Sequence, residues 1–359
     1  MKGKVNTAVF ALALAALFFG FWLSPKRVYS DNENRYLAGR PALTLQSLFA
    51  GDFTRGFEDW VTDGFPLRDR WIALKSRLDL LAGRRDTGGV YVTKEGRMME
   101  VFDEVDEARY EKNLDYLRQA KALYAELDRF DVMLIPTASH VLREQVGLPT
   151  PDVDQASLLE RASDLLTYDA LSALEAHRDE YIYYYTDHHW TSLGAWYVYA
   201  LRDDALAQEA FAQEVLTEDF LGTTFSRAGI YEKKDAITAF AYGSPTVEHN
   251  RSGAVTEGLY DRSYLSKKDK YSVFLGGNQA LTVIRTGQEG GKLLLVKDSY
   301  ANTYVQFLIP HYAEIHVVDL RSFAGSLRAY AREAGITEMT VLYNLKGFSE
   351  ETSLFRIVG

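Results

Sequence analysis

The chain has 359 residues, of which 47% are hydrophobic and 25% charged, as in a folded globular protein with one large domain or two ordinary ones. Its formal net charge is -10 at pH 7, and we find no basic cluster, so nucleic acid is not expected as a partner. The absence of cysteine excludes disulfides, thiolate metal sites and cysteine nucleophiles.

The first element is a long apolar stretch near the N-terminus. The residues from Val5 to Pro25 carry no charge, and Lys26 and Arg27 close the stretch. About 20 apolar residues suffice to cross a bilayer as a helix. We therefore predict that residues 1–25 are a single-pass membrane anchor, with the rest of the chain on the extracytoplasmic side. The alternative is a cleaved signal peptide, although the run is long for one and no cleavage pair of small residues follows at residues 21–24.

Residues 26–87 are predicted to form a juxtamembrane linker and a small helical collar. The linker is polar and rich in turn residues. Apolar residues between Trp71 and Leu81 then recur at helical spacing, and Gly83 ends that helix.

Residues 88–359 are predicted to form a catalytic α/β domain. The expected elements are a hairpin around 94–96, a helix over 104–130, a strand over 131–138, a helix over 156–175, a strand over 181–186, a helix from Thr191, a strand over 293–297, a helix over 302–312, a strand over 314–320, a helix over 326–335 and a strand over 338–345. Continuous apolar strands between amphipathic helices favour a mainly parallel sheet covered on both faces, hence three α/β/α layers. Ligands of such sheets bind outside the carboxyl ends of the strands.

The strand predicted over 181–186 ends in Asp187, His188 and His189. If the chain stays extended, Asp187 and His189 share one face and His188 points away. The competing interpretation is a metal site at these three residues. Adjacent histidines on an extended segment diverge, however, and no third cluster of ligands is visible, so we expect neither a metal nor another cofactor.

The strand predicted over 293–297 ends in Asp298 and Ser299, just before a helix. A serine at such a turn is exposed for attack, and nearby backbone N–H groups can hold an oxyanion. With Asp187 and His189, Ser299 supplies the parts of a nucleophilic triad. The simpler interpretation is that Asp298 or Ser299 only caps the helix.

Several motifs together resemble a known family. "YTDHHWTSLGAWY" and "VKDSYANTYVQFLIPHYAEIHVVDLR" are similar to the DHHW-motif proteins, relatives of the alginate O-acetyltransferases of the AlgJ/AlgX type in the SGNH-hydrolase superfamily. "ENRYLAGRP", "DGFPLRDR", "GVYVTKEGRM", "GTTFSRAG" and "YSVFLGGN" also look like family blocks in family order. The resemblance covers most of residues 33–345.

The resemblance implies an SGNH-hydrolase-like domain with Ser299 as nucleophile, His189 as general base and Asp187 as the residue that orients it. It implies transfer of acetyl groups to a polysaccharide outside the membrane, with a membrane-bound O-acyltransferase as the partner that supplies acetyl. An esterase that removes acetyl has the same chemistry, because water can replace the sugar hydroxyl. A protein of another class, a non-catalytic glycan-binding protein of the envelope, would not require all three residues.

The sequence departs from many superfamily members at Lys297, where they place glycine. The candidates for an oxyanion hole are the backbone N–H of Ser299 and the stretch at Gly277 and Asn278, because glycine allows close backbone approach and an amide can donate. For His188 we expect a polar side chain that faces the loop beneath it and is hydrogen-bonded to the backbone there; the alternative is a role toward the substrate.

Overall fold

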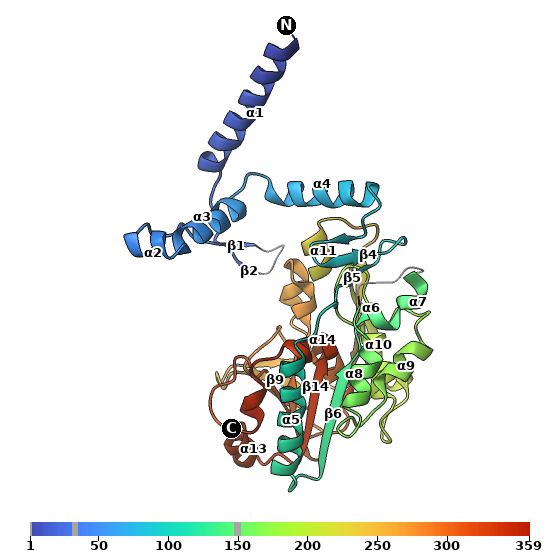
Figure 1. The fold of residues 1–359 in the computed structure, drawn as a ribbon. Coiled ribbons are helices and arrows are strands. Elements are labelled where there is room, and N and C mark those ends of the chain that lie inside the picture. The colour runs from blue at the N-terminus through green and yellow to red at the C-terminus, as the bar shows by residue number, and fades with distance from the viewer. Residues whose placement is uncertain (1, 31–34, 147–151) are drawn as a thin grey trace. The chain divides into compact units, whose positions relative to one another are not determined.

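The computed structural model describes residues 2–30, 35–146 and 152–359. The chain divides into two compact units (Figure 1). The first comprises Met1–Gly88 and Phe225–Ile230, and the second comprises Gly89–Thr224 and Tyr231–Gly359.

The first unit begins with a helix of the length and composition that can cross a membrane. The elements of this unit are α1 (Lys2–Leu23), β1 (Tyr29–Ser30), β2 (Arg35–Tyr36), α2 (Leu45–Phe49), α3 (Asp52–Asp63), α4 (Arg68–Leu81) and β3 (Asp86–Thr87). Within α1, Val5–Leu23 has a mean hydropathy of 1.9 and is almost wholly exposed. A signal sequence has the same properties, so the helix is compatible with anchoring and does not by itself establish it.

The second unit is built on a seven-stranded sheet. In spatial order its strands are β10 (Val255–Glu257), β9 (Thr246–His249), β11 (Leu281–Arg285), β13 (Glu314–Val318), β12 (Lys292–Lys297), β14 (Glu338–Asn344) and β6 (Arg129–Ile135). The pairs β12/β13, β12/β14 and β14/β6 are parallel. The pairs β10/β9, β11/β9 and β11/β13 are antiparallel.

The sheet is therefore mixed, and the expectation of a mainly parallel sheet is not met. The parallel half consists of the apolar strands that the sequence pattern predicts. The antiparallel half consists of β9, β10 and β11, which were not predicted. Only residues 286–291 connect β11 to β12, and so short a connection reverses the chain, whereas a parallel neighbour needs a longer crossover.

Apolar side chains cover both faces of the parallel half. On β12, Leu293 and Leu295 pack into one core cluster, and Leu294 and Val296 pack into a second cluster on the opposite face. This is the alternation that a strand imposes. Helices α5 (Glu107–Leu123), α13 (Leu327–Ala334) and α14 (Leu345–Glu350) supply residues to the second cluster; α9 (Ala170–Ala176), α10 (Ser192–Tyr199) and α12 (Ala301–Tyr304) supply the first. The unit thus has three α/β/α layers.

The chain has further elements, of which α11 lies mostly in the first unit. They are β4 (Val90–Val92), β5 (Met98–Glu100), α6 (Ala138–Val141), α7 (Arg143–Val146), α8 (Gln155–Arg161), η1 (Gln208–Ala210), β7 (Ala212–Phe220), α11 (Thr223–Ala228), β8 (Asp235–Ala241), η2 (Arg262–Ser266), η3 (Lys270–Val273), η4 (Val305–Phe307) and η5 (Leu354–Ile357). The hairpin predicted around 94–96 is confirmed as β4 and β5.

Four predicted elements differ from the structure. The helix predicted over 104–130 ends with α5 at Leu123, before β6 begins, and the helix predicted over 302–312 is shortened to α12 and η4. The helix predicted over 156–175 is interrupted between α8 and α9, because Thr167 exchanges two hydrogen bonds with Val132 of β6 and Asp169 caps α9. The strand predicted over 181–186 is not a strand: the chain turns there, as described below.

Candidate active site

The segment that carries Asp187, His188 and His189 is a tight turn. Tyr183 forms an isolated antiparallel bridge with Trp190, and the N–H of Tyr184 donates to the carbonyl of His189 at 3.3 Å. The chain therefore runs out and returns within a few residues. The prediction of an extended segment is wrong, because the backbone of residues 183–184 pairs with that of residues 189–190 of the same segment.

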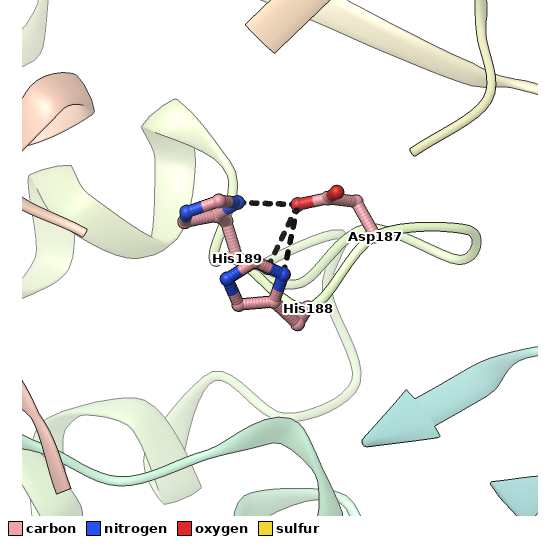
Figure 2. Close-up of side chains that lie close together, drawn as sticks. All are labelled: Asp187, His188 and His189. Atoms are coloured by element: carbon pink, nitrogen blue, oxygen red, sulfur yellow. Dashed lines mark hydrogen bonds and ion pairs between the residues drawn. The ribbon is translucent and has the colours of Figure 1, made fainter. Parts of the chain in front are cut away.

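The turn brings Asp187 and His189 together. The carboxylate Oδ1 of Asp187 accepts the backbone N–H of His189 at 3.0 Å and also bonds Nδ1 of its ring (Figure 2). Both side chains are buried. The predicted pairing of these two residues is thus present, although a turn produces it and not an extended strand.

The second carboxylate oxygen of Asp187 is held by the loop at Thr223. Oδ2 accepts the backbone N–H of Thr223 at 2.8 Å and its hydroxyl at 2.9 Å. The preceding Gly222 permits this contact, because a Cβ there would lie 2.3 Å from the same oxygen. The carboxylate is therefore fixed on both oxygens.

Ser299 meets His189 from the end of β12. The Nε2 atom of His189 lies 2.7 Å from Oγ of Ser299. Because the carboxylate of Asp187 only accepts, Nδ1 carries the ring proton and Nε2 is the acceptor for the serine hydroxyl. The three predicted residues are thus brought together in one hydrogen-bonded chain.

Asp298 stabilises the turn that presents Ser299. Its Oδ1 accepts the N–H of Tyr300 at 2.9 Å, and its Oδ2 accepts the N–H of Asn344 at 2.8 Å. Burial raises the pKa of Asp298 to about 6, and these N–H groups oppose the rise. The Ser299 hydroxyl bonds His189 and does not cap the helix.

Aromatic residues join the two segments of the site. The ring of Tyr271 stacks on the imidazole of His189, with centroids 3.8 Å apart and an interplanar angle of 11°, and its hydroxyl donates to the carbonyl of Ser299 at 2.9 Å. Tyr300 donates to the carbonyl of His188 at 2.6 Å, and the indole of Trp190 donates to the carbonyl of Tyr300 at 2.9 Å. These contacts limit relative movement of the imidazole and the serine.

The pKa values of the buried pair suit a base and its orienting carboxylate. Burial alone would raise the pKa of Asp187, but His189, His188 and the hydrogen bonds from His189 and Thr223 lower it below its ordinary value. Burial, with the neighbouring His188, lowers the pKa of His189 to about 4, and Asp187 opposes this. At neutral pH the imidazole is therefore uncharged and able to accept a proton.

His188 lies beside the same carboxylate and does not point away from it. Its Nδ1 is 3.9 Å from Oδ1 of Asp187 (Figure 2). The same atom is 2.6 Å from the hydroxyl of Thr223. Since the Thr223 hydroxyl donates to Asp187, His188 donates to that hydroxyl. His188 thus has a polar partner in a neighbouring loop, as expected, but that partner is a side chain.

The donor atoms of Asp187, His188 and His189 lie within 4.8 Å of one another, close enough for a metal ion. They are already used in hydrogen bonds. Nδ1 of His189 bonds Oδ1 of Asp187, while Oδ2 of Asp187 and Nδ1 of His188 bond Thr223. An ion would have to displace these bonds, so the arrangement does not fit a built metal site.

Two of the oxyanion candidates, Gly277 and Asn278, lie at a strained loop. Leu275, Gly276 and Gly277 all have positive φ (60°, 64° and 82°), a conformation that is unfavourable for leucine. The N–H of Gly277 donates to the carbonyl of Phe274 at 3.2 Å, so it would have to leave that bond to reach a substrate. Within the described part of the chain, neither the N–H of Ser299 nor the amide nitrogen Nδ2 of Asn278 donates a hydrogen bond.

Thr223 and Tyr271 contribute to the site without having been predicted. Both begin or lie within quoted family blocks, "GTTFSRAG" and "YSVFLGGN". The family blocks marked these two segments as candidates for a functional role. A single sequence does not show, however, that they fold against the turns that carry Asp187 and Ser299. The partners of these two residues become visible only in the structure.

Comparisons with known proteins agree on the family and the fold. A family model described as "DHHW protein" matches residues 164–318. A DHHW family protein from Eubacterium siraeum is 23% identical, with a TM-score of 0.62, and the match covers 76% of this chain and 95% of that one. Bacillus cereus PatB1, solved with a sulfonyl adduct, is 15% identical with a TM-score of 0.60, covering 75% and 98%.

The O-acetyltransferase domain of Pseudomonas putida AlgJ is 14% identical with a TM-score of 0.45, covering 74% and 93% of the two chains. Comparison with curated proteins by sequence gave no match. The resemblance predicted from the motifs is thereby confirmed: the DHHW family model matches residues 164–318, which include Asp187, His189 and Ser299.

Proposed function

We propose that this protein is a serine O-acetyltransferase that moves acetyl groups onto a cell-surface or secreted polysaccharide outside the membrane. The observation that carries the proposal is the hydrogen-bonded chain from Asp187 through His189 to Ser299. The proposed domain is SGNH-hydrolase-like and spans residues 88–359, after an anchor at 1–25 and a linker with a helical collar at 26–87.

The proposed reaction has two steps. In the first, Oγ of Ser299 attacks the carbonyl of an acetyl donor, its proton passes to Nε2 of His189, and the donor leaves with that proton as acetyl-Ser299 forms. In the second, His189 takes the proton of a sugar hydroxyl as its oxygen attacks acetyl-Ser299; the bond from the acetyl carbon to Oγ of Ser299 then breaks, and His189 returns the proton to Oγ. Asp187 holds the imidazole in the required tautomer, and no cofactor takes part.

The N–H of Ser299 and the side chain of Asn278 are proposed to stabilise the two tetrahedral intermediates. Gly277 shapes the loop that carries Asn278. Such donors are worth about 10²–10³ in rate. A membrane-bound O-acyltransferase is the proposed partner that supplies acetyl from the other side of the membrane. The name of the AlgJ domain fits this reaction class, but the weight of the proposal rests on the site.

Intact-mass measurement tests the proposal. The wild-type protein, incubated with 4-nitrophenyl acetate, is expected to gain one acetyl group, and peptide mapping should place it on Ser299. Addition of a panel of cell-surface glycans should then move the acetyl group to sugar. Release of acetate alone with every glycan would indicate an esterase, and absence of any adduct would indicate a binding protein.

A sulfonyl fluoride is a second probe of the nucleophile, because PatB1 was solved with a sulfonyl adduct. A sulfonyl group on Oγ of Ser299 should prevent acetylation of the protein. Labelling elsewhere with full retention of acetylation would contradict the assignment of Ser299.

Membrane attachment is predicted from α1. The protein should fractionate with membranes at its full length, because Val5–Leu23 is apolar enough to remain in the bilayer. Protease added to cells stripped of their wall should degrade the domain, since the site is proposed to lie outside. Recovery from the medium of a form lacking about the first 25 residues would identify a cleaved signal peptide instead.

The rate of acetyl-Ser299 formation is predicted to persist into acidic solution. The base must be uncharged, and protonation of His189 removes it, so the rate should fall as pH drops through the pKa of about 4. Burial is the main cause of this low pKa; His188 lowers the pKa further, and Asp187 and Glu100 raise it. A single-turnover profile from pH 3 to 8 measures it, and a midpoint near the ordinary 6.5 would contradict the effect of burial.

A further inference from the structure

Lys297, which stands where many members of the superfamily have glycine, is buried beside the nucleophile. It is the last residue of β12, two positions before Ser299, and only 1% of its surface is exposed. Its Nζ donates to Oδ1 of Asn278 at 2.6 Å and to Oδ1 of Asn302 at 2.8 Å. A buried ammonium is unfavourable unless its surroundings compensate for the lost water.

The compensation comes from neutral amides and not from an ion pair. Among the residues that the structure describes, no carboxylate lies within salt-bridge distance of Lys297, and Asp319 is paired with Arg321. Burial lowers the pKa of Lys297 to about 8, with Asp319 and Asp298 opposing and Arg321 adding to the shift. The side chain is thus still mainly cationic at neutral pH, and its charge acts on the amides that it contacts.

These bonds fix the orientation of the Asn278 amide. Its Oδ1 accepts from Lys297 and also from Nδ2 of Asn302 at 3.3 Å. Two donors on the oxygen exclude the flipped amide, which would turn its NH₂ group toward the ammonium. The NH₂ group of Asn278 is therefore directed away from Lys297, and no described residue accepts from it.

The two donors flank the nucleophile in the chain. Lys297 lies two residues before Ser299 and Asn302 three residues after it, so the strained loop at 275–278 is tied to the turn that carries the serine. A cation on the oxygen of an amide also polarises the amide, which strengthens its N–H groups as donors.

We infer that Lys297 is a positioning residue that holds and polarises the Asn278 amide so that its NH₂ group donates to the oxyanion formed at Ser299. The inference rests on the proposed function. It assigns no new covalent step: the negative charge that develops on the acyl oxygen is met by Asn278, and Lys297 acts through that amide without touching the substrate.

A double-mutant cycle separates this role from a structural one. The variants are Lys297→Met, Asn278→Ala and the double variant, and the readout is single-turnover acetylation by 4-nitrophenyl acetate. Asn278→Ala should slow acetylation by about 10²-fold with little change in the half-saturating ester concentration, because the bond forms in the transition state. Lys297→Met should slow it by about tenfold or more, and the double variant should be no slower than Asn278→Ala.

Matched variants control the cycle. Lys268, a partly buried lysine of the same unit, donates to the carbonyl of Leu221 at 2.9 Å, and the effect of Lys268→Met should multiply with that of Asn278→Ala. Lys297→Gln keeps a donor without the charge and should recover part of the rate lost in Lys297→Met. It also replaces Lys297→Met in the cycle if melting temperatures show that the methionine variant is unfolded.

Two results would overturn the inference. One is a rate loss in the double variant equal to the product of the losses in Lys297→Met and Asn278→Ala. The other is acetylation at the wild-type rate by a folded Lys297 variant. Both outcomes require that the wild-type protein forms acetyl-Ser299. If the wild-type protein forms none, the proposed function fails first, so the two failures are distinguishable.

Discussion

Ser299→Ala is expected to abolish formation of the acetyl-enzyme and all ester turnover. The substitution removes the oxygen that accepts the acetyl group, and the remaining donors can only assist attack by water. Loss of a serine nucleophile reduces the rate on the order of 10⁴-fold or more in comparable triads. Turnover and intact mass measure the effect directly.

The fold should survive this substitution. Both recorded hydrogen bonds of the Ser299 backbone, from the hydroxyl of Tyr271 and the N–H of Asn302, are made to its carbonyl and remain in alanine. Circular dichroism and melting temperature should therefore be close to those of the wild-type protein. Ser349→Ala removes another buried hydroxyl, which donates to the carbonyl of Lys346 at 2.7 Å, and should leave turnover intact. Near-wild-type turnover by Ser299→Ala would exclude Ser299 as the nucleophile.

The parallel half of the sheet was predictable because its strands are nearly uninterrupted apolar runs. The segment at β12 packs on both faces, so its composition alone indicates a central strand. The strands β9 and β10 were missed for the opposite reason. β10 is wholly exposed and β9 carries polar residues, so neither shows the apolar run that identifies a buried strand.

The turn at Asp187 shows where pattern reasoning fails locally. Four tyrosines and an isoleucine between residues 181 and 185 indicate a strand by composition, but in the structure Ile182, Tyr183 and Tyr184 are core residues of a turn. The alternation argument still selected His189, because Oδ1 of Asp187 reaches both the N–H and the ring of the residue two positions later. A correct pairing was thus reached through an incorrect backbone conformation.

Variants of the turn test which histidine is the base. His189→Ala is expected to prevent formation of acetyl-Ser299, because no other described group accepts a bond from the Ser299 hydroxyl and an unactivated hydroxyl is a poor nucleophile at neutral pH. His188→Ala should be much milder. It removes one hydrogen bond to Thr223, worth about 1 kcal/mol, so its main effect should be on melting temperature.

Asp187→Asn should retain the fold and lose most of the rate. Thr223 donates twice to Oδ2, so the asparagine would keep its oxygen on that side and turn its NH₂ group toward Nδ1 of His189. Nδ1 would then have to accept, which moves the ring proton to Nε2, where it cannot take the proton of Ser299. The corresponding change in a serine protease reduces kcat by about 10⁴-fold, and a loss of similar order is expected here.

Single-turnover acetylation of the three variants at one pH, with melting temperatures recorded, decides between the histidines. The contrast is sharp because both rings lie beside Asp187, with Nδ1 of His188 only 3.9 Å from the oxygen that His189 contacts. The two histidines differ in their hydrogen-bond partners. Nε2 of His189 is 2.7 Å from Oγ of Ser299, whereas Nδ1 of His188 bonds the hydroxyl of Thr223. If His188→Ala were inactive while a folded His189→Ala still acetylated, the imidazole beside Ser299 would not be the base, and the proton path would have to run through Thr223.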